Sequence, residues 1–197
     1  MVEHYFTEFP ESKLKIQKLK FELRGKEIEF YTASGLFSAK SVDKGTKLLI
    51  SKSIIENNWE VLDLGCGYGI IGLSLLLMNP TLKLTFSDIN KRAINITNMN
   101  LKLHNLKGKI IQSDGFKNIS EKFDTILLNP PQTAGKELCF RLIEDSKKHL
   151  KKNGILQIVA RHNKGGKELS KKMLKTFDNV KETAKYSGYR VYTSQKS

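Results

Sequence analysis

The sequence is poor in the residues that build metal centres and disulfide frameworks. It contains two cysteines, Cys66 and Cys139, which lie 73 positions apart, and four histidines with no pair at i, i+4 spacing. Thiolate zinc sites and disulfide scaffolds need more cysteines at closer spacing than this. The composition therefore predicts neither a structural metal nor a disulfide-stabilised protein.

Long apolar runs are also missing. No stretch approaches the roughly 20 apolar residues that span a bilayer. The first residues, MVEHYFTEFPESK, are too polar and acidic for a secretory signal. No internal repeat, linker or low-complexity tract divides the 197 residues, and 39% of them are hydrophobic. We expect a cytoplasmic protein with one folded domain over residues 1–197, in which residues 1–41 form an N-terminal extension and 42–197 a catalytic core.

Acidic residues are few relative to basic ones. The 34 lysines and arginines exceed the 20 acids, which gives a formal net charge of +14. The excess is concentrated in residues 13–26, 147–152 and 164–175. Basic residues that neutralise phosphates supply most sequence-independent affinity for nucleic acid, so the balance favours a polyanionic partner. The alternative is a solvated, lysine-rich surface without a partner.

Hydrophobic periodicity predicts strands that alternate with helices. A hairpin around Arg24 and Gly25 is expected within residues 14–31, although Ile16, Leu19 and Leu23 could also line one helical face. Strands are expected at 60–65, 82–88, 109–114, 123–129, 155–160, 180–186 and 189–194, and helices at 43–57, 70–78, 90–103, 136–150 and 167–177. This alternation implies parallel pairing through right-handed crossovers, hence an open α/β sheet with a small N-terminal β extension.

A glycine-rich turn follows the strand at 60–65. Gly65, Gly67 and Gly69 in LGCGYG allow a tight turn that a ligand can approach closely. The amides at the start of the next helix favour a carboxylate or phosphate. Asp63 makes the motif D-x-G-x-G-x-G rather than the dinucleotide pattern G-x-G-x-x-G. An acid at this place favours a cationic ligand over a diphosphate.

Two further acids, Asp88 and Asp114, end the second and third strands. A single aspartate at a strand end is commonly a turn or helix-cap residue. Acids at successive strand ends meet at the carboxyl edge of an open sheet, where such sheets bind ligands. Asp88 is suited to ribose hydroxyls and Asp114 to an adenine amino group. Together with the glycine turn they predict a pocket for a nucleoside that carries a positive charge.

The fourth strand runs into TILLNPPQTAG (125–135). Neither Pro130 nor Pro131 can donate a ladder hydrogen bond, so the strand must stop at Asn129. A stiff turn is one explanation of this stretch. The other is a rigid pair of acceptors, the Asn129 amide oxygen and the Pro130 carbonyl, placed beside the predicted ligand.

The motifs VLDLGCGYG, SDIN, QSDGF and LLNPPQ, in this order and spacing, resemble a class I S-adenosylmethionine-dependent methyltransferase. The segment ASGLFSAKSVDKGTKLLI is similar to the corresponding part of the small-subunit ribosomal RNA guanine-N2 methyltransferases, which belong to the methyltransferase small domain family. The short archaeal relatives of these enzymes resemble the chain over nearly its whole length, from HYF (4–6) to GYRV (188–191). The resemblance implies the strand order 3-2-1-4-5-7-6 with an antiparallel seventh strand.

The resemblance also implies S-adenosyl-L-methionine as cofactor and assigns residues to it. Gly65, Cys66 and Gly67 would border its methionine part, close to Asp63. Asp88 would hold the ribose and Ile89 the adenine ring, with Asp114 and Gly115 at the adenine edge.

Catalysis is assigned by the resemblance to Asn129, Pro130 and Pro131. Two acceptors that hold both N–H groups of a delocalised amine would favour a pyramidal nitrogen whose lone pair faces the methyl group. Many N-P-P enzymes place an aromatic residue next, whereas this chain has Gln132. Phe37, Tyr68 or Phe116 would then supply the stacking platform, and Phe37 and Gln132 are the expected substrate contacts.

The favoured function is methylation of guanine N2 in ribosomal RNA, with transfer RNA as the nearest alternative substrate. A protein glutamine methyltransferase uses the same N-P-P chemistry, but such enzymes usually have N-P-P-Y and a helical N-terminal domain. A non-catalytic RNA-binding module is a further alternative. The intact Asp63, Asp88, Asp114 and Asn129 argue against it.

Overall fold

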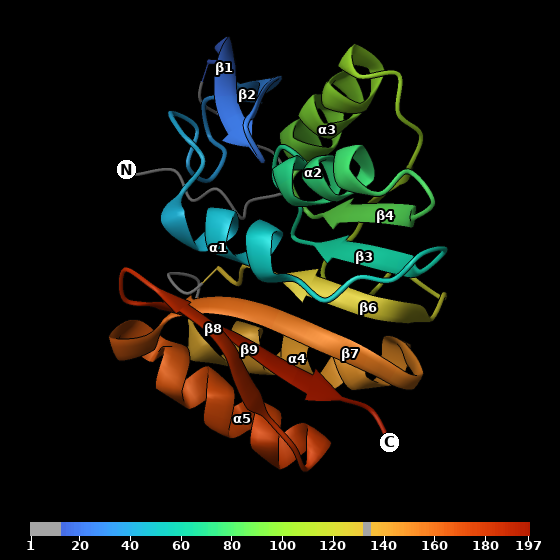
Figure 1. Ribbon diagram of the computed structural model, residues 1–197, viewed down its shortest axis with the longest axis vertical. Coiled ribbons are helices and arrows are strands. Elements are labelled where there is room, and N and C mark those ends of the chain that lie inside the picture. The colour runs from blue at the N-terminus through green and yellow to red at the C-terminus, as the bar shows by residue number, and fades with distance from the viewer. Residues whose placement is uncertain (1–12, 132–134) are drawn as a thin grey trace.

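A seven-stranded mixed sheet forms the centre of the computed structural model, which describes residues 13–131 and 135–197 (Figure 1). Its strands are β3 (Glu60–Leu64), β4 (Lys83–Asp88), β5 (Lys109–Gln112), β6 (Phe123–Leu128), β7 (Leu150–Arg161), β8 (Lys181–Tyr186) and β9 (Tyr189–Gln195). They lie in the order β5-β4-β3-β6-β7-β9-β8, and β9 is antiparallel to both of its neighbours. The predicted α/β class and strand order are confirmed. The HYF stretch and Gln132 lie outside the described residues.

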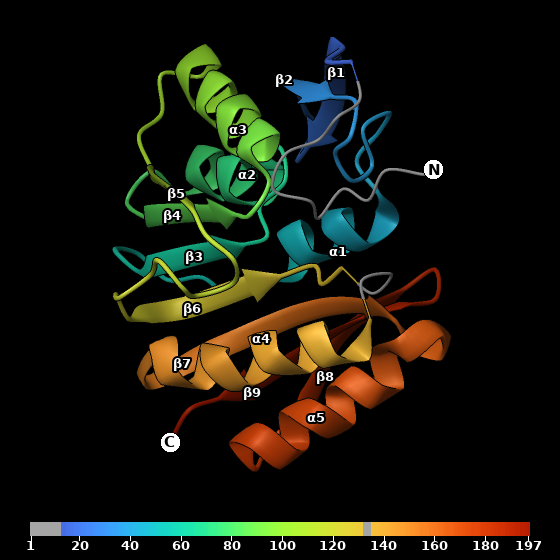
Figure 2. The same ribbon diagram turned by 180° about the vertical axis from the view of Figure 1, so that it is seen from behind.

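Helices cover both faces of this sheet (Figures 1 and 2). They are α1 (Lys44–Lys52), α2 (Ile70–Met78), α3 (Lys91–Leu103), α4 (Lys136–His149) and α5 (Lys167–Phe177), with a π-helical turn η2 (His162–Gly166) before α5. Side chains alternate between two cores: Val61 packs on the side of α1, α2 and α3, whereas Leu62 and Leu64 pack on the side of α4 and α5. A strand buried on both faces explains why β3 is apolar apart from Asp63 and from Glu60 at its partly exposed start.

The N-terminal segment is a hairpin of β1 (Ile16–Leu23) and β2 (Lys26–Ala33). Arg24 and Gly25 both have positive φ angles, 50° and 77°, as a two-residue hairpin turn requires. The hairpin prediction is therefore confirmed over the helical alternative. Asn100 of α3 fastens the hairpin to the glycine turn, because its amide nitrogen donates to the carbonyls of Tyr31 (2.9 Å) and Tyr68 (2.8 Å).

Several element ends differ from the sequence-based expectation. The helix expected to reach residue 57 ends at Lys52. The cause is Gln157 on β7, whose side chain accepts from the Ile54 amide (2.8 Å) and donates to the Ile54 carbonyl (2.9 Å). Strands β5 and β6 end at Gln112 and Leu128. The predicted site residues Asp114 and Asn129 therefore lie on the loops that follow these strands. Strand β7 is longer than predicted and begins at Leu150.

Among the described helices, none is both long enough and apolar enough to cross a membrane.

Candidate functional site

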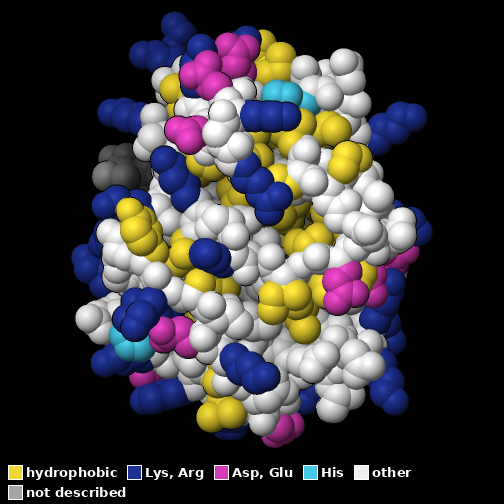
Figure 3. All heavy atoms as spheres, viewed as in Figure 1, with side chains coloured by type: hydrophobic (Ala, Val, Ile, Leu, Met, Phe, Trp, Pro, Cys, Tyr) yellow, Lys and Arg dark blue, Asp and Glu magenta, His cyan; other side chains and the backbone are white. Residues whose placement is uncertain are grey.

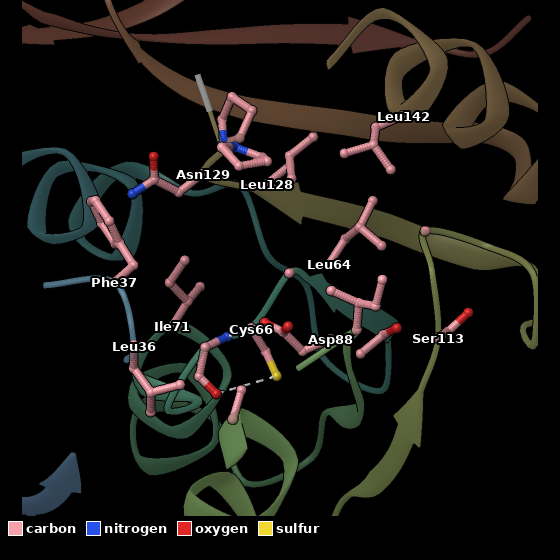
Figure 4. Close-up of a pocket in the computed structure, with 18 of the residues that line it drawn as sticks. Leu36, Phe37, Leu64, Cys66, Ile71, Asp88, Ser113, Leu128, Asn129 and Leu142 are labelled. Carbon is pink, nitrogen blue, oxygen red and sulfur yellow. Dashed lines mark hydrogen bonds between the residues drawn. The ribbon is translucent and has the colours of Figure 1, made fainter. Parts of the chain in front are cut away.

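A cavity opens at the carboxyl edge of the sheet, where β3, β4, β5 and β6 end (Figure 4). The glycine turn, the loops after β4, β5 and β6, and the loop that precedes α1 contribute to its wall. Figure 4 shows Asp88 and Ser113 at one end of the cavity and Asn129 and Phe37 at the other. The parallel strands thus bring the glycine turn and the motifs that follow β4, β5 and β6 to one cavity.

The glycine turn presents bare backbone to this cavity. Gly65 and Gly67 have φ angles of +66° and +57°, and a Cβ added to either would meet open space. Gly69 is also left-handed, but a Cβ there would come within 2.8 Å of Thr97 on α3. The first two glycines therefore leave room for a ligand, whereas Gly69 is required by packing between helices.

Asp63 lies behind the turn rather than on the cavity wall. Its side chain is fully buried, and its Oδ2 accepts from the Gly72 amide in the first turn of α2 at 2.9 Å. Burial, reinforced by the charge of Asp88, raises the pKa of Asp63 to about 7, although the Gly72 hydrogen bond opposes the shift. The carboxyl therefore ties β3 to the start of α2 and holds the turn in place.

Asp88 lies on the cavity wall with a fixed carboxylate. Its Oδ2 accepts from the Gly67 amide (2.8 Å) and its Oδ1 from the Asn90 amide (2.9 Å). Burial raises the pKa of Asp88, and these amide hydrogen bonds counteract the shift. Each carboxylate oxygen can accept more than one hydrogen bond, so the group is still able to bind ligand hydroxyls.

The remaining predicted cofactor residues also border the cavity. The Cys66 thiol is buried beside the Thr97 hydroxyl (3.6 Å), and burial raises its pKa well above the usual range, which keeps the sulfur neutral. Ile89 and Gly115 line the wall next to Asp88 and Asp114. Asp114 is half-exposed and forms an ion pair with Arg141 of α4 (2.8 Å), a partner that the sequence did not suggest.

Asn129 belongs to a hydrogen-bond chain that the sequence-based interpretation missed. Its Nδ2 donates to Thr46 Oγ1 at 3.0 Å, and the Thr46 hydroxyl donates to Asp43 Oδ2 at 2.5 Å. Asp43 is also the N-cap of α1, since its Oδ1 accepts from the Gly45 and Thr46 amides. The signal was present as an aspartate three positions before a threonine at a helix start. Its long-range partner was not visible in the sequence.

The three candidate stacking residues differ in position. Phe116 is buried and stacks on His149 with ring centroids 4.4 Å apart, and Tyr68 is 4% exposed and stacks on Phe30. Phe37 is 41% exposed and borders the cavity next to Asn129. Pro130 and Pro131 are part of the same wall. Of the three aromatic residues, Phe37 alone is both exposed and beside Asn129.

The family model for the methyltransferase small domain matches residues 27–193. The uncharacterised protein YbxB of Bacillus subtilis is 39% identical over the full length of both chains. This full-length relative is bacterial, and the expected resemblance to short archaeal proteins stays a prediction. The ribosomal RNA small subunit methyltransferase C of Pseudoalteromonas translucida is 37% identical over 81% of this chain and 47% of its own length.

Solved structures share the fold. The T. thermophilus 16S rRNA N2 G1207 methyltransferase, solved in complex with AdoMet and guanosine, superposes with a TM-score of 0.80 at 21% identity, over 95% of this chain and 52% of that one. A methyltransferase from Pyrococcus furiosus gives a TM-score of 0.70 at 18% identity, over 83% of this chain and 90% of that one. The chain thus spans the full length of one relative and about half the length of the ribosomal RNA methyltransferases that it matches.

Proposed function

The chain belongs to the methyltransferase small domain family of class I S-adenosylmethionine-dependent methyltransferases, and from this premise we propose that it methylates an exocyclic amine of RNA, with guanine N2 of ribosomal RNA as the target. Two named relatives support this target, because one is a small-subunit ribosomal RNA methyltransferase and another acts at N2 of a guanine in 16S rRNA. The formal charge of +14 fits a polyanionic substrate.

The cavity fits S-adenosylmethionine. A Cβ at Gly65 or Gly67 would project into open space, so these glycines leave a cradle for the methionine part of the cofactor. Asp88 would hold the ribose, Ile89 the adenine ring, and Asp114 with Gly115 the adenine edge. The Ser87 hydroxyl borders the same cavity and is a buried polar atom without a hydrogen-bond partner among the described residues. When bound, the cofactor supplies a methyl group activated by its sulfonium charge.

The observation that carries the proposed chemistry is the orientation of the Asn129 amide. Because its nitrogen donates to Thr46, its oxygen is the acceptor for a substrate amine. We propose that this oxygen and the Pro130 carbonyl hold the two N–H groups, while Pro131 keeps Pro130 extended. Preorganised acceptors would stabilise the positive charge that develops on the nitrogen. The methylated nitrogen is then acidic enough to lose its extra proton to water, so no separate strong base is needed. Phe37 would stack on the target base, with Gln132 as a further substrate contact.

The purified chain is expected to transfer labelled methyl groups from S-adenosylmethionine to ribosomal RNA from a strain that lacks its gene. Mass spectrometry of nuclease fragments of this RNA should then find N2-methylguanosine, because the oriented pair of acceptors holds an exocyclic amine. Ribosomal RNA from the parent strain is the control and should accept little label. Label in transfer RNA alone would change the target, and label only in protein would contradict an RNA substrate.

A further inference from the structure

Two of the lysine-rich stretches, 147–152 and the start of 164–175, lie at opposite edges of the seven-stranded sheet, whereas most of 13–26 belongs to the separate hairpin. Strand β7 is parallel to β6 and starts at Leu150, so residues 147–152 lie at the amino edge, away from the cavity. Three of these cations are in ion pairs: Lys147 with Asp178 (3.8 Å), Lys148 with Asp145 (2.8 Å) and Lys151 with Asp124 (2.8 Å). On the face in Figure 3, basic side chains are spread widely. The position of a lysine relative to the sheet edges therefore indicates whether it lies on the cavity side, whereas its clustering in the sequence does not.

A different row of side chains crosses the carboxyl edge. Arg161, Tyr189 and Tyr186 lie opposite one another on the adjacent strands β7, β9 and β8. The Arg161 guanidinium lies over the Tyr189 ring, 5.2 Å from its centroid, and Tyr186 is 61% exposed. The exposed Lys164 follows in η2, after β7 ends. This row combines cations with an exposed aromatic ring.

Helix α1 connects the row to the cavity. The Tyr189 ring packs so close to Gly45 that a Cβ there would come within 2.7 Å of it. Lys44 Nζ donates to Ser187 Oγ in the turn between β8 and β9 (3.3 Å). The loop before α1 supplies the exposed Lys40 and Phe37, and Phe37 borders the cavity. The surface is therefore continuous from β8 to the Asn129 end of the site.

We infer that this carboxyl-edge rim, made of Phe37, Lys40, Lys44, Arg161, Lys164 and Tyr186, binds the single-stranded RNA segment that carries the target amine. The inference rests on the proposed RNA substrate. Lysines and arginine neutralise phosphates, and exposed aromatic rings stack on unpaired bases, which is the combination that single-stranded RNA requires. The acid beside these cations, Asp43, uses both carboxylate oxygens in the cap of α1 and the Thr46 hydrogen bond.

Reversing three rim charges in one variant, Lys44→Glu, Arg161→Glu and Lys164→Glu, tests this surface. The matched control reverses the same number of exposed lysines at the amino edge, Lys83→Glu, Lys148→Glu and Lys152→Glu, with the same change in net charge. Binding of a labelled single-stranded RNA oligonucleotide is measured across a range of salt concentrations. We expect the rim variant to bind roughly 100-fold more weakly at 0.1 M salt and the log–log salt slope to fall by about 2 to 3, because three phosphate contacts are lost.

The control variant should stay within a few-fold of the wild type. Equal losses in the two variants would overturn the rim, since net charge alone would then explain binding. If the wild type binds the oligonucleotide without salt dependence and transfers no methyl group to ribosomal RNA, the proposed RNA substrate fails and the rim with it. Wild-type methyl transfer with an unaffected rim variant would overturn the rim alone.

The hydrogen-bond chain at Asn129 carries a second, independent inference. A carboxylate only accepts hydrogen bonds, so the single Thr46 hydroxyl hydrogen goes to Asp43. The Thr46 oxygen must then accept from Asn129, which requires the amide nitrogen on that side. Thr46 is 5% exposed and lies in the first turn of α1, where both its amide and its hydroxyl donate to the N-cap residue Asp43. The arrangement prevents the amide from turning over.

We propose that Thr46 is a positioning residue that keeps the Asn129 oxygen directed as the acceptor for the substrate amine. This inference also rests on the proposed function. Valine has nearly the shape of threonine without its hydroxyl, so Thr46→Val would allow both amide orientations. We expect kcat to fall roughly 10- to 100-fold, the scale of a misplaced catalytic group. The affinity for S-adenosylmethionine should not change, and Thr46→Ser should restore most of the activity.

Methyl transfer by Thr46→Val, Thr46→Ser, Asn129→Ala and the Thr46→Val/Asn129→Ala double variant separates the outcomes. If Thr46 acts through Asn129, Thr46→Val should cause no further loss in the Asn129→Ala background. A further loss there, or wild-type turnover in Thr46→Val while Asn129→Ala is inactive, would overturn the positioning role and leave the proposed function standing. Wild-type turnover in Asn129→Ala would remove the catalytic assignment itself.

Discussion

Gly67→Arg is expected to abolish S-adenosylmethionine binding while the protein remains folded. The residue has a φ angle of +57°, and its Cβ direction leads into open space at the cavity. An arginine side chain would occupy the volume of the ligand and place a positive charge close to the sulfonium. We expect affinity to fall by at least about 100-fold, close to 3 kcal/mol of binding free energy. Calorimetric titration with S-adenosylmethionine measures the loss directly.

The control for this experiment is Gly25→Arg in the hairpin turn. Gly25 also has a positive φ angle, +77°, and open space around its Cβ, but it is not among the residues that line the cavity. Both variants therefore carry a similar backbone strain, about 1–2 kcal/mol for a left-handed residue with a side chain. Only the cavity variant should lose the ligand. Unchanged binding in Gly67→Arg, or equal binding of NADH by the wild type, would refute the cofactor assignment.

The order of elements could be predicted because local patterns are strong here. Strand β3 is apolar except for Asp63 and for Glu60 at its start, and the left-handed Gly65 of the glycine turn ends it. The hairpin turn at Arg24 and Gly25 could be predicted because a two-residue turn needs positive φ angles, which glycine adopts readily. The sequence also indicated which residues would meet at the carboxyl edge, because parallel strands bring their ends together.

Side-chain partners could not be predicted, because they depend on packing between distant segments. The carboxyl of Asp63 was expected beside the ligand, but it is fully buried against α2. Asp114 pairs with Arg141, 27 positions later. Thr46 reaches Asn129 across 83 positions, and no local pattern contains that distance. The lysines at 147–152 formed the most obvious charge cluster in the sequence, but β7 carries them to the edge opposite the cavity.

Asn129→Ala is expected to remove most of the methyl transfer activity without unfolding the protein. The substitution deletes the amide oxygen proposed to accept from the substrate amine, while both prolines remain. Loss of one preorganised hydrogen-bonding group typically costs on the order of 100-fold in rate or more. The residue lies one position beyond β6 and is half-buried, and the one hydrogen bond described for it is to Thr46. Its structural contribution should therefore be about 1 kcal/mol.

The measurement is methyl transfer from labelled S-adenosylmethionine to ribosomal RNA that lacks the modification, with calorimetry and thermal melts on the same samples. Asn79→Ala is the matched control, because Asn79 lies at the C-terminus of α2 and its amide bonds to Asn57 (3.0 Å) and Thr81 (2.7 Å). Both variants lose an asparagine side chain, but only Asn129 borders the cavity. If Asn129→Ala keeps wild-type turnover, or unfolds where Asn79→Ala does not, Asn129 with its two prolines is a stiff turn and not a catalytic motif.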